Sequence, residues 1–387
     1  MFSDDELNTI LSSEFQEEVS NNISRNALDI AVDRHIPNAR LVATLVKYLE
    51  RAKKKLPTFY EARAVMHEMS FEQSSSEECA RAKGLSGDTL LDLSFGLGVD
   101  SVILSKNFKD VTAIEISEPN CRIGRENLKR LGISNVHLYC SRAEEFLEKT
   151  NKEFDWILID PDRRSNGKKM VLLEDCSPNI LEIEGLLRKK GRHVCIKCSP
   201  LFDTKEAFRL FPDCHVEVVA MHNETKEVNI FIDGSLPRII VRNLPEGSIE
   251  TPWPIKKISP NVLAEDATAL KYLFIPSPAI DHARMLGIIM EKYNAYWEEC
   301  GIALMDRMPT EMYPGQLYYV EQYLPFSPKL LKSTINGNRS LILLRNFDMG
   351  ISQLRKMLKT SEGTTETWCF SRIENRRVAF RIKKVNL

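Results

Sequence analysis

Apolar and polar positions follow two different periods along the chain, and the change of period divides the chain into regions. From residue 1 to about residue 70 the apolar residues recur at helical spacing, most clearly in residues 41–56. From Gly87 to about Asp233, short apolar strands alternate with amphipathic helices. This alternation predicts an α/β fold with a doubly wound sheet of seven strands, whose last two strands, at 216–221 and 227–232, form an antiparallel hairpin.

The chain after residue 236 shows weaker and more mixed patterns. Five prolines between residues 237 and 260 predict a linker or a domain boundary. A strand and helices are expected in residues 273–299, and from Gly315 onward four strands and the helix 351–359 form a last module. The chain is therefore expected to end in small α+β modules that follow the main sheet.

Residues 89–117 carry the strongest functional pattern of the sequence, which reads strand, glycine turn, helix, strand and acid. Closely spaced glycines let a backbone approach a nucleotide, and an acid about 20 residues further on accepts ribose hydroxyls. Glu115 lies 19 residues after Gly96, near the end of the second strand, so it fits the ribose acid better than an ordinary surface acid. The cofactor residues predicted from this pattern are Phe95, Gly96, Gly98, Glu115 and Ile116.

The residues around the glycine turn favour one class of cofactor over another. A dinucleotide-binding turn prefers a third glycine, and Ser101 occupies that position here. Asp92 and Asp100 flank the turn, and their carboxylates would repel a pyrophosphate. S-adenosylmethionine (SAM) carries an ammonium and a sulfonium and has no phosphate. The two acids therefore predict SAM, and both are assigned to the cofactor site.

A second functional pattern, Asp160-Pro161-Asp162-Arg163, follows the apolar strand expected at residues 156–159. Ligands of such sheets bind at the carboxyl ends of the strands. The Asp160 carboxylate and the Pro161 carbonyl can accept hydrogen bonds from an exocyclic amine, while Arg163 suits a phosphate or a base. A strand-breaking turn is the alternative interpretation. The combination with the glycine turn favours an active site in which Asp160, Pro161 and Arg163 are the catalytic residues.

Other candidate residues carry less specific signals. Arg142, Ala143 and Glu144 follow the third strand, where this type of sheet contacts adenine, so we assign them to the cofactor site. Cys198 is the one candidate nucleophile for methylation of a pyrimidine carbon, but no partner base is identifiable, and a buried thiol fits it better. The histidines show no metal-ligand spacing, and Cys195 with Cys198 forms a lone CxxC on a strand, so no metal is predicted.

The composition is typical of soluble globular proteins. Hydrophobic residues make up 43% and charged residues 28% of the chain, and no apolar run approaches the roughly 20 residues that span a bilayer. The acidic N-terminus lacks the pattern of a signal peptide, so we expect a cytoplasmic protein. Nine scattered cysteines in a long chain argue against a disulfide framework.

Charge is unevenly distributed along the chain. Residues 319–387 contain 13 Lys and Arg against 5 Asp and Glu, a balance of +8, so the rest carries −9 of the total of −1. A basic module on an acidic body suggests a polyanion, such as nucleic acid, as a partner. A solvated basic face without a partner is an equally good interpretation of the charge alone.

Taken together, these motifs resemble class I SAM-dependent methyltransferases. The resemblance rests on residues 92–98, on Glu115 and on residues 160–164. More closely, the chain resembles a bacterial family that joins such a domain to a small ferredoxin-like domain and a C-terminal THUMP-like domain. The stretches that resemble this family also include residues 71–75, 173–178, 197–200 and 226–227, and the resemblance covers most of the chain from about Glu61 onward.

The resemblance implies an RNA-modifying enzyme, because THUMP domains elsewhere bring RNA to such enzymes. It also implies that Gln73 and Ser74, which otherwise fit a helix cap, line the cofactor pocket. Two positions depart from the family. Arg142 stands where an Asp commonly holds the adenine amine, so Glu144 or a backbone group must take that role. Cys198 stands where an aliphatic residue is usual, which weakens the case for a nucleophile.

We therefore expect a Rossmann-like, seven-stranded methyltransferase sheet with an N-terminal helical region and small C-terminal α+β domains. The expected activity is SAM-dependent methylation at a base nitrogen of RNA. Two alternatives stay open: a small-molecule or protein methyltransferase whose C-terminal domain dimerises, and a non-catalytic RNA-binding protein. The expected domains are an N-terminal helical region at 1–80, a SAM-dependent methyltransferase domain at 81–236, a linker with a ferredoxin-like domain at 237–317 and a basic THUMP-like domain at 318–387.

Overall fold

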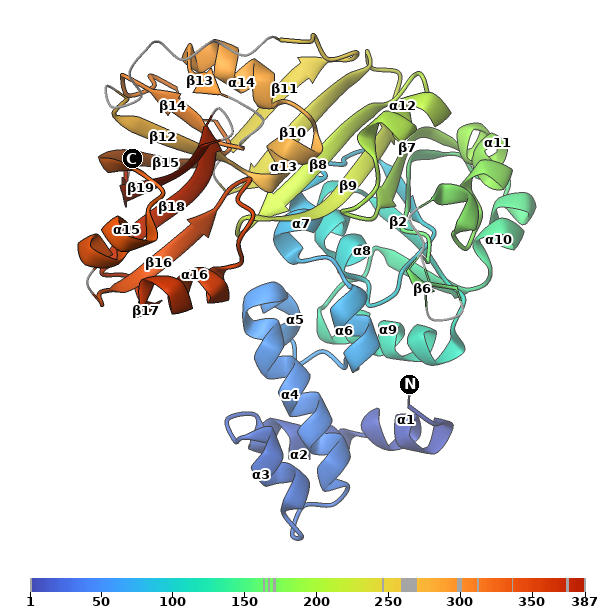
Figure 1. The fold of residues 1–387 in the computed structure, drawn as a ribbon. Coiled ribbons are helices and arrows are strands. Elements are labelled where there is room, and N and C mark those ends of the chain that lie inside the picture. The colour runs from blue at the N-terminus through green and yellow to red at the C-terminus, as the bar shows by residue number, and fades with distance from the viewer. Residues whose placement is uncertain are drawn as a thin grey trace. The chain divides into compact units, whose positions relative to one another are not determined.

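The computed structural model forms two compact units and is drawn as a ribbon in Figure 1. The first unit comprises Met1–His215 and Glu227–Leu236, and the second comprises Val216–Lys226 and Pro237–Leu387. The structure describes residues 2–162, 164–165, 168–169, 172–245, 247–258, 270–297, 301–311, 313–335, 337–373 and 376–385.

The N-terminal part of the first unit is helical, as predicted. The Ser3 and Ser12 hydroxyls cap the N-termini of the first two helices, since each accepts the backbone N–H of the residue three positions later. The helix α4 (Ala39–Lys55) contains the predicted amphipathic stretch and ends in three lysines, whose charge suits a helix C-terminus. The other helices before the sheet are α1 (Asp4–Ile10), α2 (Ser13–Asn22), α3 (Ala27–Val32), α5 (Pro57–Glu61), α6 (Glu68–Gln73) and α7 (Glu77–Ala82).

Among the described residues of the first unit, five parallel strands and one antiparallel strand form the main sheet, in the order β9-β7-β4-β1-β2-β3. A separate two-stranded sheet pairs β5 with β6. The strands are β1 (Thr89–Asp92), β2 (Asp110–Glu115), β3 (Val136–Cys140), β4 (Phe154–Ile159), β5 (Arg164–Ser165), β6 (Lys168–Lys169), β7 (Gly191–Cys198) and β9 (Glu224–Ile232). The helices between them are α8 (Val99–Leu104), α9 (Glu118–Arg130), α10 (Ala143–Lys149), α11 (Ile180–Lys190) and α12 (Thr204–Leu210), with 3-10 turns at Ser105–Asn107 and Leu173–Asp175.

The large sheet contains more strands than the sequence predicts. Its order is β11-β10-β8-β9-β7-β4-β1-β2-β3, so it has nine strands among the described residues instead of seven. One of the seven expected strands is β8 (His215–Met221), and the two additional ones are β10 (Arg238–Leu244) and β11 (Gly247–Pro252). Three of the five prolines that suggest a linker lie at the ends of these strands, since Pro237 precedes β10, Pro245 follows it and Pro252 ends β11, while Pro260 lies outside the described residues. A proline at a strand end removes no hydrogen bond from the interior of the sheet.

The second unit also contains an eight-stranded sheet, counted over the part of the chain that the structure describes. Its order is β13-β14-β12-β15-β19-β18-β16-β17. The strands are β12 (Tyr272–Pro276), β13 (Tyr296–Trp297), β14 (Ala303–Met305), β15 (Gly315–Pro325), β16 (Arg339–Leu344), β17 (Ser361–Glu362), β18 (Glu366–Ile373) and β19 (Arg376–Lys384). The helices are α13 (Pro278–His282), α14 (Leu286–Tyr293), α15 (Pro328–Ile335) and α16 (Ile351–Leu358).

Two cores lie on opposite faces of this second sheet. Trp368 and Phe370 of β18 pack with leucines of α15 and α16, whereas Cys369 packs with Leu273 of β12 and Tyr318 of β15. Neighbouring residues of a strand point to opposite faces, so β18 supplies both cores. The four strands and the helix that the sequence predicts after residue 315 are confirmed by β15, β16, β18, β19 and α16.

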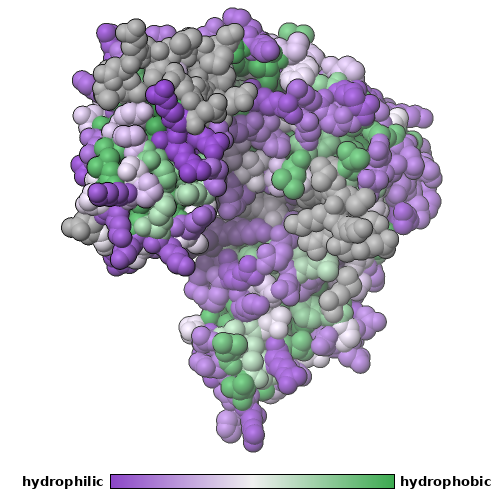
Figure 2. Space-filling model, in the orientation of Figure 1, coloured by the Kyte–Doolittle hydropathy of each residue, from purple (hydrophilic) through white to green (hydrophobic). Residues whose placement is uncertain are grey.

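Hydrophilic residues cover most of the coloured surface on the face drawn in Figure 2. Hydrophobic residues lie on this face in small separate groups. Leu28 and Val32 are among the exposed apolar side chains of the N-terminal helices. Among the described residues, no helix combines the length and the apolar character that crossing a membrane would require.

Candidate active site

The glycine turn follows β1 and leads into α8. Gly96 and Gly98 have φ angles of +56° and +84°, a left-handed conformation that favours glycine. A Cβ atom on Gly98 would lie 2.3 Å from Cζ of Phe95, so a larger residue would also lack space. The Phe95 ring is buried in the hydrophobic core. This packing leaves the backbone of Phe95, rather than its ring, for contact with a cofactor.

Glu115, the predicted ribose acid, lies at the end of β2 and ties the glycine turn to that strand. Its Oε2 accepts the backbone N–H of Gly96 at 2.9 Å. Its Oε1 accepts the backbone N–H of Ser117 at 2.8 Å and the side-chain amide of Asn120 at 3.4 Å. A carboxylate has about four acceptor positions, so these contacts leave capacity for a ribose hydroxyl.

Asp92 is a buried acid behind the turn, with 2% of its surface exposed. Its Oδ2 accepts the Ser101 hydroxyl at 2.6 Å, and its Oδ1 accepts the backbone N–H of Ser94 at 3.0 Å. Desolvation by burial raises the pKa of Asp92 to about 6, although the hydrogen bond from Ser101 opposes this rise. The serine in place of a third glycine therefore has a structural role, because its hydroxyl is a partner of Asp92.

Asp100, at the start of α8, belongs to a buried cluster of charged groups. The Lys83 ammonium lies 2.8 Å from Asp100 and 2.9 Å from Glu227, and the Ser75 hydroxyl donates to Asp100 at 3.0 Å. The Lys83 side chain is fully buried. Desolvation lowers the pKa of Lys83, but the Asp100 and Glu227 carboxylates outweigh it and hold that pKa above its ordinary value. Lys83 is therefore a buried cation between two acids.

A second buried lysine joins this cluster to the predicted acceptor site. Lys197 lies on β7, and its ammonium is 2.5 Å from Asp160 Oδ2 and 4.0 Å from Asp100 Oδ2. Desolvation lowers the pKa of Lys197, but Asp160 and then Asp100 reverse this effect and raise it overall. The backbone N–H of Asp160 donates to the Ser94 hydroxyl at 2.7 Å, which connects the end of β4 to the glycine turn. Pro161 is buried, and Arg163 lies outside the described residues.

These charged residues form one network at the carboxyl edge of the sheet, and acids outnumber bases in it. With every member ionised, four carboxylates and two ammonium groups give a net charge of −2. Such an excess of negative charge at a ligand-binding edge favours a cationic ligand. The Ser94 hydroxyl links Asp92 to Asp160, because it donates to Asp92 Oδ1 at 3.4 Å and accepts the backbone N–H of Asp160. The network consists of Lys83, Asp92, Asp100, Asp160, Lys197 and Glu227.

The residues predicted to contact adenine lie at the neighbouring edge, where β2 and β3 end. The backbone N–H of Ser141 donates to the Glu115 carbonyl at 3.0 Å, which joins the two strand ends. Ile116 is 61% exposed, a large exposed fraction for an apolar side chain. Arg142 pairs with Glu144 at 3.2 Å, so the unusual arginine is compensated by the acid two residues later. Ala143, at the start of α10, is buried.

The segment between α6 and α7 approaches the network from the N-terminal side. Gln73 is exposed, and the Ser74 hydroxyl donates to the Phe71 carbonyl of its own helix. Ser75 is the residue of this segment that contacts Asp100, while the Ser76 hydroxyl caps α7 by accepting the backbone N–H of Cys79. In this segment Ser75 hydrogen-bonds to Asp100, whereas the role of Gln73 and Ser74 in lining the cofactor pocket stays a prediction.

Sequence reasoning did not identify three members of the network as site residues: Lys83, Lys197 and Glu227. Lys83 ends α7 and resembles a surface lysine of an amphipathic pattern, so nothing in the sequence marks it as buried. Lys197 and Glu227 occur in stretches that resemble the family, and this was the only available signal for them.

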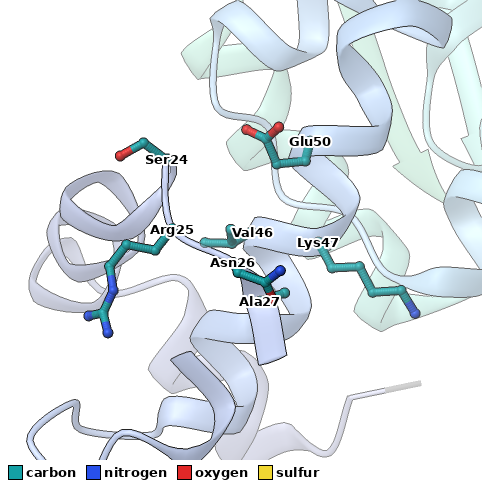
Figure 3. A pocket seen from close by; sticks show the side chains of 7 residues that line it. All are labelled: Ser24, Arg25, Asn26, Ala27, Val46, Lys47 and Glu50. Atoms are coloured by element: carbon teal, nitrogen blue, oxygen red, sulfur yellow. The ribbon is translucent and has the colours of Figure 1, made fainter. Parts of the chain in front are cut away.

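An open pocket of about 490 Å³ lies elsewhere, on the N-terminal helices (Figure 3). Side chains of the α2–α3 connection and of α4 line it. It shares no residue with the charged network or with the glycine turn, and it has no bearing on the chemistry at the sheet edge. Its lining residues are Ser24, Arg25, Asn26, Ala27, Val46, Lys47 and Glu50.

Two family models match the chain. Residues 85–240 match a model described as a methyltransferase domain, and residues 315–384 match one described as THUMP domain-like. The first match contains the glycine turn, Glu115, Asp160 and Lys197. The second covers β15, α15, β16, α16, β17, β18 and β19.

Curated relatives are similar to the methyltransferase part of the chain. An uncharacterized RNA methyltransferase of Thermosynechococcus vestitus is 26% identical over 140 residues, which are 35% of this chain and 31% of the relative. An uncharacterized S-adenosylmethionine-dependent methyltransferase of Mycobacterium tuberculosis is 28% identical over 154 residues, 40% of this chain and 41% of the relative. A tRNA/tmRNA (uracil-C(5))-methyltransferase of Psychromonas ingrahamii is 31% identical over 139 residues, 30% of this chain and 38% of the relative. The chain thus spans less than half the length of these relatives.

One solved structure resembles the whole chain. It is a methyltransferase candidate from Porphyromonas gingivalis W83, with a TM-score of 0.83 and 21% identity, and the match covers 100% of both chains. At this level of identity the similarity establishes the fold. The ferredoxin-like domain and the domain boundaries expected from the sequence stay predictions. The resemblance to a methyltransferase joined to a THUMP-like domain is confirmed, because residues 85–240 match the methyltransferase model and residues 315–384 match the THUMP-like model.

Proposed function

We propose that this protein is a SAM-dependent methyltransferase that modifies a base nitrogen of RNA. The observation that carries the proposal is the buried network with a net charge of −2 beside the glycine turn. SAM has one positive charge more than it has negative charges, and its sulfonium has no counter-ion within the molecule. A pocket edge with an excess of carboxylates therefore suits SAM better than it suits a phosphate-bearing cofactor.

In this proposal the cofactor binds to residues that follow β1 and to residues at the end of β2. Glu115 accepts the ribose hydroxyls, and the backbone of Gly96 and Gly98 lies against the cofactor because neither residue has a side chain. Ile116 covers one face of the adenine, which would account for its exposure in the absence of a ligand. Asp92 and Asp100 supply the negative charge for the methionine ammonium and the sulfonium.

The acceptor base enters at the end of β4. The Asp160 carboxylate and the Pro161 carbonyl accept hydrogen bonds from an exocyclic amine, and Lys197 holds the carboxylate in place. The lone pair of the nitrogen then attacks the methyl carbon while the carbon–sulfur bond breaks and its electron pair returns to sulfur. The sulfonium would thereby become a neutral thioether, and the proton of the methylated nitrogen would pass to solvent.

The basic C-terminal module supplies the RNA contacts in this proposal. Three arginines of this module are paired with acids of the same module: Arg372 and Arg377 both bind Asp348, and Arg355 lies 3.3 Å from Glu362. These pairs reduce the charge that the arginines can offer to RNA. Exposed lysines of the two helices that pack together, α15 and α16, are the better candidates: Lys329, Lys332, Lys356 and Lys359.

Methylation of a pyrimidine carbon is less well supported. That reaction requires a cysteine nucleophile that reaches the base. Cys198 is the last residue of β7, but it is 2% exposed, and its thiol lies 3.8 Å from the Ile196 carbonyl within the same strand. The uracil-specific activity named for the Psychromonas ingrahamii relative is therefore not carried over to this chain.

Calorimetric titration of SAM tests the cofactor part of the proposal. We expect micromolar binding to the wild type and binding at least tenfold weaker, about 1.4 kcal/mol, for Glu115→Gln. Glu145→Gln, which changes an exposed acid of α10, is the matched control and should bind as the wild type does. Absence of binding to the wild type, together with no competition by S-adenosylhomocysteine, would refute the enzyme proposal and favour an RNA-binding protein.

Transfer of labelled methyl groups tests the acceptor. We expect label in total RNA, recovered after digestion in a nucleoside methylated on a base nitrogen. Label found only in small molecules or in protein would reject the RNA assignment while it retains the methyltransferase assignment. The dimerising role for the C-terminal module would then be the better explanation of its charge.

A further inference from the structure

Three potential metal ligands meet behind the ribose acid, where β2 and β3 end. The ligand atoms of Glu118, Cys121 and Cys140 all lie within 4.8 Å of one another. Glu118 is the first residue of α9, Cys121 follows one helical turn later, and Cys140 is the last residue of β3. No part of the proposed methyl transfer uses these three residues.

Local geometry brings the three side chains together. Residues three apart lie on the same face of a helix, so Glu118 and Cys121 project from α9 in one direction. Parallel pairing of β2 with β3 places Cys140 directly beside Glu115. The Cys121 thiol donates to the Glu115 carbonyl at 3.4 Å, and the Cys140 thiol lies 3.9 Å from the Ile116 carbonyl. Both thiols are thus fixed against the backbone of the predicted cofactor segment.

The chemistry of this ligand set points to zinc. Zn²⁺ prefers tetrahedral coordination by thiolates at about 2.3 Å and carboxylate oxygens at about 2.0–2.2 Å. Those bond lengths place ligand atoms roughly 3.5–4 Å from one another, which is compatible with the observed cluster. Hard cations such as Mg²⁺ and Ca²⁺ prefer oxygen ligands and are disfavoured by two sulfur atoms.

Solvent exposure distinguishes one thiol of this cluster from the other cysteines. Cys140 is exposed, whereas the other free cysteines among the described residues, including Cys121, are buried. Glu118 is exposed as well. A metal ion can therefore reach Glu118 and Cys140 directly from solvent and then bind Cys121, which is buried next to them. Three protein ligands leave the fourth tetrahedral position to water.

We propose that Glu118, Cys121 and Cys140 form a binding site for Zn²⁺. On binding, each thiol releases its proton to solvent and ligates as a thiolate, while the carboxylate supplies the third bond. The site rests on these three side chains alone and does not depend on the proposed methyl transfer. It revises the expectation of no metal, which rested on the spacing of histidines and on a CxxC. Residues 121 and 140 lie on different elements and form no sequence motif.

Cobalt substitution in the reduced, full-length protein tests the site directly. Co²⁺ bound by two thiolates produces intense sulfur-to-metal charge-transfer absorption in the near ultraviolet, along with the visible bands of tetrahedral Co²⁺. We expect one Co²⁺ per chain, displaced by Zn²⁺, and a dissociation constant for Zn²⁺ of about 1 μM or lower when measured by competition with a chromophoric chelator.

Substitutions at the two exposed ligands, Glu118 and Cys140, keep the test independent of folding defects. Cys140→Ser should weaken Zn²⁺ binding more than tenfold and reduce the charge-transfer absorption. Cys140→His should retain tetrahedral Co²⁺ with about half of that absorption, because imidazole replaces one thiolate. Glu118→Gln should weaken binding, whereas Glu145→Gln, an exposed acid on α10, should leave it unchanged.

Lack of charge-transfer absorption in the reduced wild type would overturn the proposal, even if the two thiols formed a disulfide under oxidising conditions. Absorption that survives Cys140→Ser unchanged would also overturn it, because the metal would then lie elsewhere. Titration of SAM into the same metal-free preparation separates the two proposals: failure of the metal site leaves SAM binding intact, and the reverse holds equally.

Discussion

Replacing Asp92 with asparagine should stabilise the methyltransferase domain and at the same time weaken its cofactor binding. Asparagine has the same shape and keeps an oxygen for the backbone N–H of Ser94, while its amide can donate to the Ser101 hydroxyl. The substitution therefore removes a buried charge without creating a cavity. The difference in stability between this variant and the wild type is therefore the free-energy cost of ionising Asp92 inside the protein.

The magnitude of that cost follows from the pKa of Asp92. Burial raises this pKa from 3.8 to about 6, and each pKa unit corresponds to about 1.36 kcal/mol, so ionised Asp92 destabilises the fold by about 3 kcal/mol. Between these two pKa values the folded state binds more protons than the unfolded state. Stability of the wild type therefore falls as pH rises through this window and is constant above it.

The expected signature is a stability difference between Asp92→Asn and the wild type that grows with pH. About 2 kcal/mol of the increase should fall between pH 4.5 and pH 7.5, with a plateau above that range. Hydrogen exchange of the β1 and β2 amides is the suitable measurement, because the two compact units can unfold separately and a single global transition cannot be assumed. Asp88→Asn, which changes an exposed acid just before β1, is the control.

A stability difference that does not change with pH would refute the reasoning, because it would mean that Asp92 is ionised without cost. Asp88→Asn should show none of the pH-dependent increase. SAM affinity provides the second half of the test. We expect Asp92→Asn to bind SAM at least tenfold more weakly than the wild type, since one of the carboxylates that favour a cation is gone.

Three further predictions follow from the turn, the second lysine and the basic module. Gly98→Ala should lower the stability of the domain by more than about 2 kcal/mol in thermal unfolding, because the new Cβ clashes with the Phe95 ring and the backbone is strained as well. Gly132→Ala is the control, since its φ is +66° but nothing lies within 4 Å of the new Cβ, and it should cost only about 1 kcal/mol. Lys197→Met should reduce kcat for methyl transfer more than tenfold with little change in KM for SAM, and Lys197→Arg should restore part of it; equal losses in both variants would argue against an ion-pairing role. Combined Lys356→Glu and Lys359→Glu should weaken RNA binding and flatten its salt dependence while SAM binding is unchanged, as filter binding at several salt concentrations would show.

Local sequence patterns predict much of this fold because the interactions involved are short in sequence. The glycine turn is read from two glycines, and the acid that holds it lies one strand further on. The amphipathic helix near residues 41–56 and the strands after residue 315 follow from the periodicity of their apolar residues. The prolines near residue 237 coincide with a division between the two compact units, which falls between Leu236 and Pro237. They do not mark an irregular linker, because the apolar run that follows forms β10 and a proline at a strand end is compatible with a sheet.

The charged network lies beyond the reach of such patterns. Lys83 and Glu227 are separated by 144 positions, and only the folded sheet brings the end of α7 to the start of β9. Amphipathic patterns predict that a lysine side chain is exposed to solvent, so the sequence does not distinguish a fully buried lysine from an exposed one. Its detection requires the partners on both sides, and these come from different elements.

A network of this kind is a poor way to stabilise a sheet, which argues that its composition reflects a ligand. Buried ion pairs are often no more stabilising than well-packed apolar residues, because desolvation of both charges offsets their attraction. A purely structural network would also be expected to balance its charges, whereas Lys83 and Lys197 together offset only two of the three acids Asp100, Glu227 and Asp160, and Asp92 adds a fourth. The additional acids leave a surplus of negative charge in a poorly solvated place. A bound cation would remove that surplus, so the cost borne by the empty protein becomes binding free energy for a ligand with the charge of SAM.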